Sequence, residues 1–251
     1  MPNHVTNILT FTGSQEKISE MLGKIQFQNS PGTLDFNKII PMPESLEMNS
    51  GSITNEAIVS YMRAVNPETP VFDDIEKLPF NDYMELLQKV TNAVGILYPD
   101  RVKDITPELI QLGSRYVDNI RQYGCSDWYD WRIRNWGTKW NSYDGGFCDD
   151  NKILFLTAWS RPQEIIQKLA EMYPEICIEH LWADEDYGYN CGKAVYENGQ
   201  LTEEFIPDGG SDEADEIADS VFSCDIINDQ SEEFGPEMWH HVALYLWRAK
   251  K

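Results

Sequence analysis

Apolar and polar residues alternate over residues 4–12, a segment that is also rich in β-branched side chains. This pattern predicts a strand with one buried face. Over residues 14–25 the apolar positions instead recur at helical spacing, with Ser14 placed to cap the helix. Alternation returns over residues 33–40 and stops at Pro41, because proline cannot donate a hydrogen bond to a sheet. This N-terminal segment therefore predicts a strand, a helix and a second strand.

The same succession is predicted again in the second half of the chain. Residues 153–159 form a nearly continuous apolar run, which is typical of a central strand. Residues 160–173 carry an apolar stripe at helical spacing, with Ser160 as the expected N-cap, and residues 176–182 alternate as another strand. Two such units in succession predict a ferredoxin-like antiparallel sheet with two helices on one face. The predicted fold class is therefore α+β.

The segment between the two units has helical periodicity interrupted by prolines. Its clearest predicted helices cover residues 54–65, 80–98 and 106–124, the last with Thr106 as N-cap and Pro107 as first residue. Residues 138–148 are expected to pair with the strand at 153–159, and the Asn198-Gly199 pair predicts a tight hairpin. Further helices are predicted at residues 212–224 and 236–250. The predicted domains are a ferredoxin-like domain (1–48 and 126–206), a helical insertion (49–125) and an acidic C-terminal helical extension (207–251).

Length and composition describe an ordinary globular protein. The chain has 251 residues, 41% of them hydrophobic, which is enough for a sizeable core. We find neither an apolar run long enough to span a membrane nor a signal-peptide pattern, so we expect a cytosolic protein without a membrane partner. The five cysteines are widely spaced and form no CxxC pair, so we expect free thiols, mostly buried, and no metal or cofactor.

The distribution of charge is uneven. The formal net charge is -22, which opposes attraction to nucleic acid or to anionic lipid. No lysine or arginine occurs between Lys193 and Arg248, whereas that interval holds fourteen acidic residues, namely Glu197, Glu203, Glu204, Asp208, Asp212, Glu213, Asp215, Glu216, Asp219, Asp225, Asp229, Glu232, Glu233 and Glu237. These acids form either a solvated face that favours solubility or a face that a partner recognises, as nucleic-acid mimics do.

The stretch DWYDWRIRNWGTKWNSYD, residues 127–144, is the main candidate for binding chemistry. We expect its first part to be a helix that ends at Gly137 and its second part to continue as a strand. In one interpretation its tryptophans pack where the helical insertion docks on the sheet, with indole N–H groups bonded to backbone carbonyls. In the other, cations beside exposed rings form a stacking platform for a base, a nucleotide or a peptide. The candidate binding residues are Arg132, Arg134, Trp136, Lys139, Trp140 and Asn141.

The remaining motifs are weaker. His240 and His241 are adjacent on a predicted helix and point in different directions, so they cannot both bind one metal ion. The Asp184-Glu185-Asp186 run has oxygen ligands for a cation, but it lacks the spacing of an EF-hand, and we expect a loop at the end of a strand. Signatures of nucleophilic hydrolases, metalloproteases and phosphate-binding loops are missing from the sequence. Catalytic residues are therefore not predicted.

Four stretches together resemble a known family: PNHVTNILTFTG, DFNKIIPMPESL, WRIRNWGTKWN and LFLTAWSRPQEIIQKLAEMYP. Their residues and their order along the chain are similar to those of bacteriophage, plasmid and other mobile-element proteins that carry a YubB-type ferredoxin-like domain. The resemblance covers residues 1–48 and 128–200 and leaves out the helical insertion and the acidic C-terminal region. It implies the fold and a mobile-element origin, but no catalytic activity or ligand. The name of the fold describes topology only, because the chain has no cysteine array for an iron–sulfur cluster.

Three functions remain open on this basis. The first is a non-enzymatic protein that binds or inhibits a host macromolecule, with a host protein as the expected partner. The second is single-stranded nucleic acid or nucleotide binding by the sheet and the tryptophan-lysine segment, which the net charge disfavours. The third is an enzyme with its site between the sheet and the helical insertion, which a deep polar pocket around Trp136, Lys139 and Asn141 would support.

Overall fold

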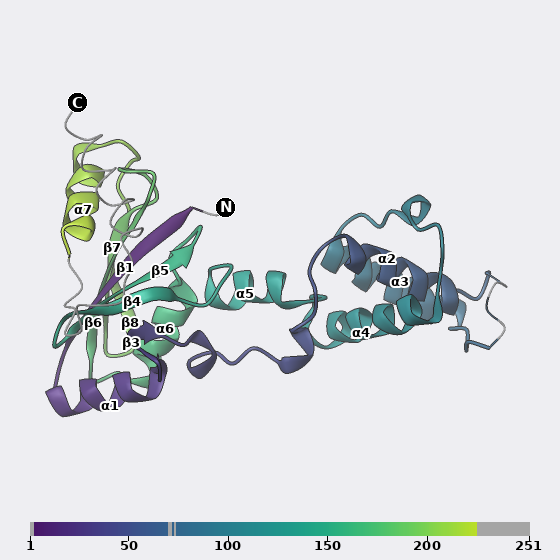
Figure 1. The fold of residues 1–251 in the computed structure, drawn as a ribbon, viewed down its shortest axis with the longest axis horizontal. Coiled ribbons are helices and arrows are strands. Elements are labelled where there is room, and N and C mark those ends of the chain that lie inside the picture. Colours follow the sequence, from purple (N-terminus) through teal and green to yellow (C-terminus); the bar gives the residue numbers. More distant parts are fainter. Residues whose placement is uncertain (1–2, 70–71, 73, 225–251) are drawn as a thin grey trace. The chain divides into compact units, whose positions relative to one another are not determined.

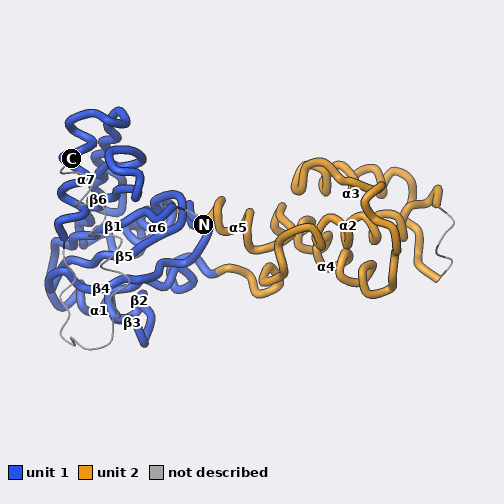
Figure 2. The backbone as a smooth tube through the Cα atoms, turned by 45° about the horizontal axis from the view of Figure 1, so that its top comes forward, with its two compact units in different colours: residues 1–41, 136–251 blue, residues 42–135 orange. Residues whose placement is uncertain are grey.

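The structure is a computed structural model that describes residues 3–69, 72 and 74–224. The chain forms two compact units, which Figure 2 distinguishes by colour and which are described separately below. Unit 1 contains residues 1–41 and 136–251, and unit 2 contains residues 42–135. The sequence-based domain boundaries stay a prediction.

Unit 1 is an α+β unit around a six-stranded sheet (Figure 1). Its elements are β1 (His4–Thr12), α1 (Gln15–Ile25), β2 (Gln26–Phe27), β3 (Ser30–Leu34), η1 (Phe36–Lys38), β4 (Tyr143–Asp149), β5 (Lys152–Ala158), α6 (Gln163–Met172), β6 (Cys177–Asp184), β7 (Gly192–Glu197), β8 (Gln200–Phe205) and α7 (Asp212–Phe222). The strand order is β4-β5-β1-β6-β7-β8, and every neighbouring pair is antiparallel. The predicted fold class is confirmed, with β1, β5 and β6 at the predicted places.

The central strands of this sheet are buried on both faces, whereas every residue of the edge strand β8 is exposed. On one face, Ile8, Leu154 and Ala183 pack against Ala214 and Ala218 of α7. The alternate residues of β1 point to the opposite face and are also fully buried. There, α1 and α6 contribute the apolar stripes that the sequence predicts, with Ile18, Met21, Leu22, Ile25, Ile165, Ile166 and Leu169 buried. The continuous apolar run of β5 follows from this two-sided cover.

The local signals mark several element ends correctly. The hairpin between β7 and β8 turns at Asn198 (φ 51°) and Gly199 (φ 78°), the left-handed conformations that this dipeptide favours. The predicted C-terminal helix is present as α7, where the Ser211 side chain accepts a hydrogen bond from the Ala214 amide. The helix predicted at residues 236–250 and the pair His240-His241 lie outside the described residues.

Three local predictions are wrong, each because side chains bond to the backbone. The strand expected at residues 33–40 ends at Leu34, since the Asp35 carboxylate accepts from the Asn37 amide and starts η1. The strand expected from residue 138 begins only at Tyr143. The helix after β5 starts at Gln163, so Ser160 is not its N-cap, and the Ser160 hydroxyl donates to the Gly137 carbonyl instead.

Unit 2 is helical, as predicted. It consists of η2 (Glu44–Leu46), α2 (Ser52–Val65), α3 (Phe80–Val94), η3 (Pro99–Arg101), α4 (Pro107–Tyr123) and α5 (Trp128–Trp136), whose last residue belongs to unit 1. Thr106 caps α4 by accepting from the Leu109 amide, and Pro107 opens the helix. The core of the unit is formed by Ile58, Met62, Leu86, Val90, Tyr116, Val117 and Ile120.

The thiols differ in part from the expectation. All five cysteines are free, but only Cys125 and Cys191 are buried, and Cys148, Cys177 and Cys224 are half-buried. Burial raises the pKa of the thiols of Cys125, Cys177 and Cys191, so these three are weak nucleophiles at neutral pH.

A polar chain crosses the core of unit 1. His180 of β6 is fully buried, and its Nε2 lies 3.0 Å from the Asn7 side-chain oxygen on β1. The Asn7 side-chain nitrogen donates to Thr157 Oγ1 (2.8 Å) and to the Val5 carbonyl (3.0 Å). Burial, reinforced by the charge of Arg161, lowers the pKa of His180 to about 3, so the ring is neutral at physiological pH.

This lowered pKa makes a pH dependence of stability testable. The unfolded chain binds a proton at His180 near pH 6.5 and the folded chain only near pH 3, so its contribution is complete above pH 6.5 and lost progressively below it. In urea unfolding between pH 5 and 7.5, we expect the difference in unfolding free energy between the native chain and His180→Gln to change by up to about 1.4 kcal/mol per pH unit below pH 6. The glutamine keeps an amide donor for Asn7 but cannot titrate. A difference that stays constant over this range would show that His180 is not held neutral by the fold.

Candidate functional site

The six predicted binding residues are divided between the two units. Arg132 and Arg134 belong to unit 2, whereas Trp136, Lys139, Trp140 and Asn141 belong to unit 1. They are therefore described unit by unit.

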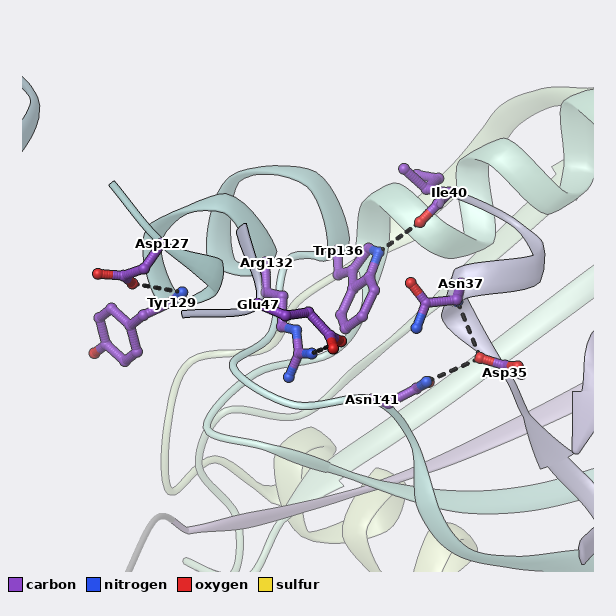
Figure 3. Close-up of polar contacts among 9 residues, drawn as sticks. All are labelled: Asp35, Asn37, Ile40, Glu47, Asp127, Tyr129, Arg132, Trp136 and Asn141. Atoms are coloured by element: carbon purple, nitrogen blue, oxygen red, sulfur yellow. Dashed lines mark hydrogen bonds and ion pairs between the residues drawn. The ribbon is translucent and has the colours of Figure 1, made fainter. Parts of the chain in front are cut away.

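Trp136 is a core residue of unit 1. Its side chain is fully buried, and its ring packs edge-on against Phe36 with ring centroids 5.7 Å apart. The indole N–H donates to the Ile40 carbonyl over 2.9 Å (Figure 3). Because no part of the ring reaches the surface, Trp136 anchors the end of α5 and offers nothing for a ligand to stack on.

The Asn141 side chain forms hydrogen bonds to two backbone amides and to the Asp35 side chain. Its side-chain oxygen accepts from the amides of Phe36 (2.8 Å) and Ser142 (2.9 Å). Its side-chain nitrogen donates to the Asp35 carboxylate over 3.0 Å (Figure 3). Both the oxygen and the nitrogen of the Asn141 amide are thus hydrogen-bonded. These side-chain bonds take the place of the backbone hydrogen bonds that a strand would form here. This explains why the predicted alternation of residues 138–143 does not form.

The two arginines, Arg132 and Arg134, make their contacts within unit 2. Arg132 lies over the Trp128 ring, 4.9 Å from its centroid. Its guanidinium also lies 3.9 Å from the Glu47 carboxylate (Figure 3). Burial lowers its pKa, which Glu47 partly opposes. Arg134 donates to the Gly124 carbonyl that ends α4. Glu47, Met48, Asn49, Trp128 and Arg132 line a shallow pocket of about 240 Å³.

Lys139 and Trp140 are half-buried and lie beside further aromatic residues of unit 1. The Lys139 ammonium lies 5.1 Å from the centroid of the Trp140 ring and 4.6 Å from that of Trp159. Both distances are in the range of cation–π attraction. Trp140 also packs edge-on against Tyr143, whose hydroxyl lies 2.7 Å from His4 Nδ1. We call Lys139, Trp140, Tyr143 and Trp159 the tryptophan corner.

Trp159 lies outside the candidate stretch at residues 127–144, and the sequence pattern did not indicate it as a binding residue. It follows β5, and its backbone adopts a left-handed conformation (φ 71°) that costs energy for a bulky residue. Its amide donates to the Asn3 carbonyl over 2.9 Å, and its carbonyl accepts from the Asn190 side chain over 3.1 Å. The side chain nevertheless remains 42% exposed. The backbone is thus fixed while the ring faces solvent.

The loop between β6 and β7 supports Trp159. Asp184, which is buried, accepts hydrogen bonds from the side chains of Asn3 (3.1 Å) and Asn190 (2.8 Å) and from the Asp186 amide (2.9 Å). Asp184 is the last residue of β6, and the predicted loop begins at Glu185. The Asp184 carboxylate holds this loop in place. Within the described residues no group of three or more His, Cys, Asp or Glu is placed to hold a metal ion.

A second exposed aromatic follows in the same loop. Tyr189 is 51% exposed and its ring lies against Gly209, where a Cβ atom would come within 2.5 Å of the ring. Gly188 accepts a backbone hydrogen bond from Gly210 over 2.8 Å, so this loop is joined to the segment that leads into α7. Hydrogen bonds therefore join the loop that holds Tyr189 to the Trp159 backbone on one side and to the segment before α7 on the other.

Carboxylates surround this surface. Asp186, Asp208, Asp212, Glu213, Asp215, Glu216 and Asp219 are all exposed. Within residues 3–224, as far as they are described, no ion pair involves a carboxylate of α7. Burial and a hydrogen bond to Asp219 raise the pKa of Tyr187 to about 12, so this tyrosine stays a neutral donor to the acidic helix. We call Trp159, Tyr189 and these seven acids the acidic aromatic surface.

The architecture and the exposed surface define an α+β protein with a ferredoxin-like domain that presents aromatic and acidic side chains. Residues 135–225 match a family model described as the ferredoxin-like domain in Api92-like protein. The match includes α7, which the sequence resemblance left outside. A crystal structure of a protein api92 from Yersinia pseudotuberculosis is similar at 11% sequence identity and a TM-score of 0.40, covering 84% of this chain and 100% of that chain. A search of curated proteins finds no match. Within the described residues, no helix is long and apolar enough to cross a membrane.

Proposed function

We propose that the chain is a non-enzymatic interaction protein of a mobile genetic element, which binds a host protein through the acidic aromatic surface. The observation that carries this proposal is the exposure of Trp159 on a left-handed backbone whose carbonyl is bonded to Asn190, the residue that follows exposed Tyr189. Tryptophan and tyrosine are the residues that most often supply binding energy at protein interfaces. Rigid placement lowers the entropy that such a ring loses on binding.

The surrounding charge indicates the chemistry of the partner. The aromatic pair is bordered by the carboxylates of the β6–β7 loop and of α7, which have no ion-pair partner among the described residues. A positively charged protein surface would pair with these carboxylates and could also pack against the two aromatic rings. The complementary charges would speed association at low salt. The expected partner is therefore a basic host protein.

One observation favours a second candidate, single-stranded nucleic acid or a nucleotide. Lys139 lies next to two tryptophan rings, and a cation beside exposed aromatics is the arrangement that stacks bases and contacts phosphate. The carboxylates around it oppose a polyanion. Binding that weakens steeply with salt and disappears in Lys139→Ala would identify this function instead.

The test is affinity capture with tagged protein from bacterial lysate, with and without nuclease, followed by mass spectrometry. We expect a basic protein in stoichiometric amount, retained after nuclease treatment and lost from the double variant Trp159→Ala/Tyr189→Ala. A second variant, Asp212→Lys/Glu213→Lys/Glu216→Lys, should lose the same protein by charge repulsion. Tyr98→Ala is the matched control, because Tyr98 is 42% exposed, like Trp159, but lies in unit 2. Capture that is unchanged in both surface variants would contradict the proposal.

A further inference from the structure

Three buried polar atoms of unit 1 have no hydrogen-bond partner among the described residues. They are Nδ1 of His180 on β6, the hydroxyl of Tyr196 on β7 and Nη1 of Arg161 in the segment between β5 and α6. His180 and Tyr196 are 0% and 1% exposed. A buried polar atom without a partner costs about 1–3 kcal/mol, so three of them in one region point to a bound molecule that bonds to all three.

The three side chains share one face of the sheet. The β6–β7 register pairs His180 with Ala194 and Ile178 with Tyr196, which places His180 and Tyr196 on the same face as diagonal neighbours. The Arg161 guanidinium stacks on Trp182, 3.9 Å from the ring centroid, and the Trp182 ring is 5.1 Å from that of His180. Arg161 is close enough that its charge lowers the pKa of both His180 and Tyr196, although burial raises that of Tyr196 overall to about 12.

The hydrogen bonds of Asn7 determine which molecule fits. Because the Asn7 nitrogen donates to the Val5 carbonyl, which can only accept, its oxygen must be the atom that faces His180 Nε2. That oxygen accepts, so Nε2 of His180 carries the proton. The neutral ring then presents the lone pair of Nδ1. The bound molecule must donate to His180 and accept from the Arg161 N–H.

We propose that a single structural water molecule occupies the space between His180, Tyr196 and Arg161. It donates one hydrogen to His180 Nδ1, accepts from Arg161 Nη1 and makes its third bond with the Tyr196 hydroxyl. Three bonds to buried polar groups is the usual number for an internal water. An anion does not fit, because it has no hydrogen to give to Nδ1, and a metal cation would face the positive charge of Arg161.

The water completes a connection between the sheet core and the segment that presents Trp159. Thr157 Oγ1, which accepts from Asn7, donates to the Ser160 carbonyl over 2.8 Å. The water links His180 to Arg161, the residue after Ser160. Residues 159–161 are therefore fixed both by this water and by the bond from Thr157 to the Ser160 carbonyl. This site does not depend on the proposed function.

The first test is a high-resolution crystal structure together with the nitrogen chemical shifts of His180 in NMR spectra. We expect electron density for one water within hydrogen-bond distance of all three atoms and a ring protonated only at Nε2. A direct bond between any two of the three side chains, absence of the density, or protonation at Nδ1 would overturn the proposal.

The second test uses Tyr196→Phe, which removes one hydroxyl and keeps the ring. If the hydroxyl bonds to the water, its loss makes the unfolding equilibrium constant roughly fivefold larger. If the hydroxyl is buried without a partner, its removal leaves that constant unchanged or makes it smaller, and the proposal fails. Tyr189→Phe, at a tyrosine that is 51% exposed, is the control and should have no effect.

Discussion

Replacing Trp136 with alanine should destabilise unit 1 by about 3–5 kcal/mol, the range for removing a buried large aromatic side chain. Trp136 is fully buried and packs edge-on against Phe36. The variant would leave a cavity of nearly a whole indole and an unpaired Ile40 carbonyl, which accepts the indole N–H in the native chain. In a domain of marginal stability this loss approaches the whole free energy of unfolding.

Two variants separate the contributions to this loss. Trp136→Phe keeps most of the apolar volume but removes the hydrogen bond to Ile40, so we expect a smaller cost of about 1–2 kcal/mol. Trp159→Ala removes the same side-chain type from the surface and should change stability by less than about 1 kcal/mol. Urea unfolding followed by circular dichroism measures all three. Equal losses for Trp136→Ala and Trp159→Ala would show that Trp136 is not the anchor of the α5 end.

The elements predicted correctly have a signal that acts within a few residues. Thr106 and Pro107 start α4 where a side-chain cap and a fixed φ are needed, and the Asn198-Gly199 turn needs left-handed backbone that these residues tolerate. Hydrophobic periodicity likewise located β1, β5 and β6, because each buries the face that the pattern defines.

The errors arise where a distant side chain replaces the backbone partner. The alternation at residues 138–142 resembles a strand, but Asn141 bonds to Phe36, which is 105 positions away in the sequence. Local periodicity contains no information about that partner. The Asp35 cap of η1 is a different case, because an aspartate that bonds two residues ahead is a known local alternative to a strand.

The candidate site was predictable only in part for the same reason. The sequence indicated Lys139 and Trp140, but it gave Trp136 the same weight, although one tryptophan is buried and the other half-buried. Trp159 resembled the last apolar residue of a strand, and its exposure depends on the partners Asn3 and Asn190 in other parts of the chain. Whether an aromatic side chain is buried or exposed depends on its tertiary contacts, which the composition of a segment does not reveal.

Gly113→Ala should have the largest effect in unit 2. Gly113 lies in α4, where a Cβ atom would be 2.0 Å from the Ala57 carbonyl oxygen and 2.6 Å from its carbonyl carbon in α2. Both are backbone atoms, so the clash is relieved only if the two helices move apart. That movement would disturb the packing of Ile58 and Val117 in the core. We expect a loss of about 3 kcal/mol or more, at the upper end for overpacking.

The matched control for this variant is Gly23→Ala, which should have the opposite sign. Gly23 is exposed in α1, and a Cβ atom there would meet nothing within 4 Å. Alanine at that site should stabilise the chain by about 0.5–1 kcal/mol, because it restricts the unfolded state and favours the helix. Calorimetry and hydrogen exchange distinguish the two cases, since Gly113→Ala should lower protection in α2 and α4. If alanine at both positions shifted stability in the same direction, the close approach of α2 and α4 at Gly113 would not be what requires glycine there.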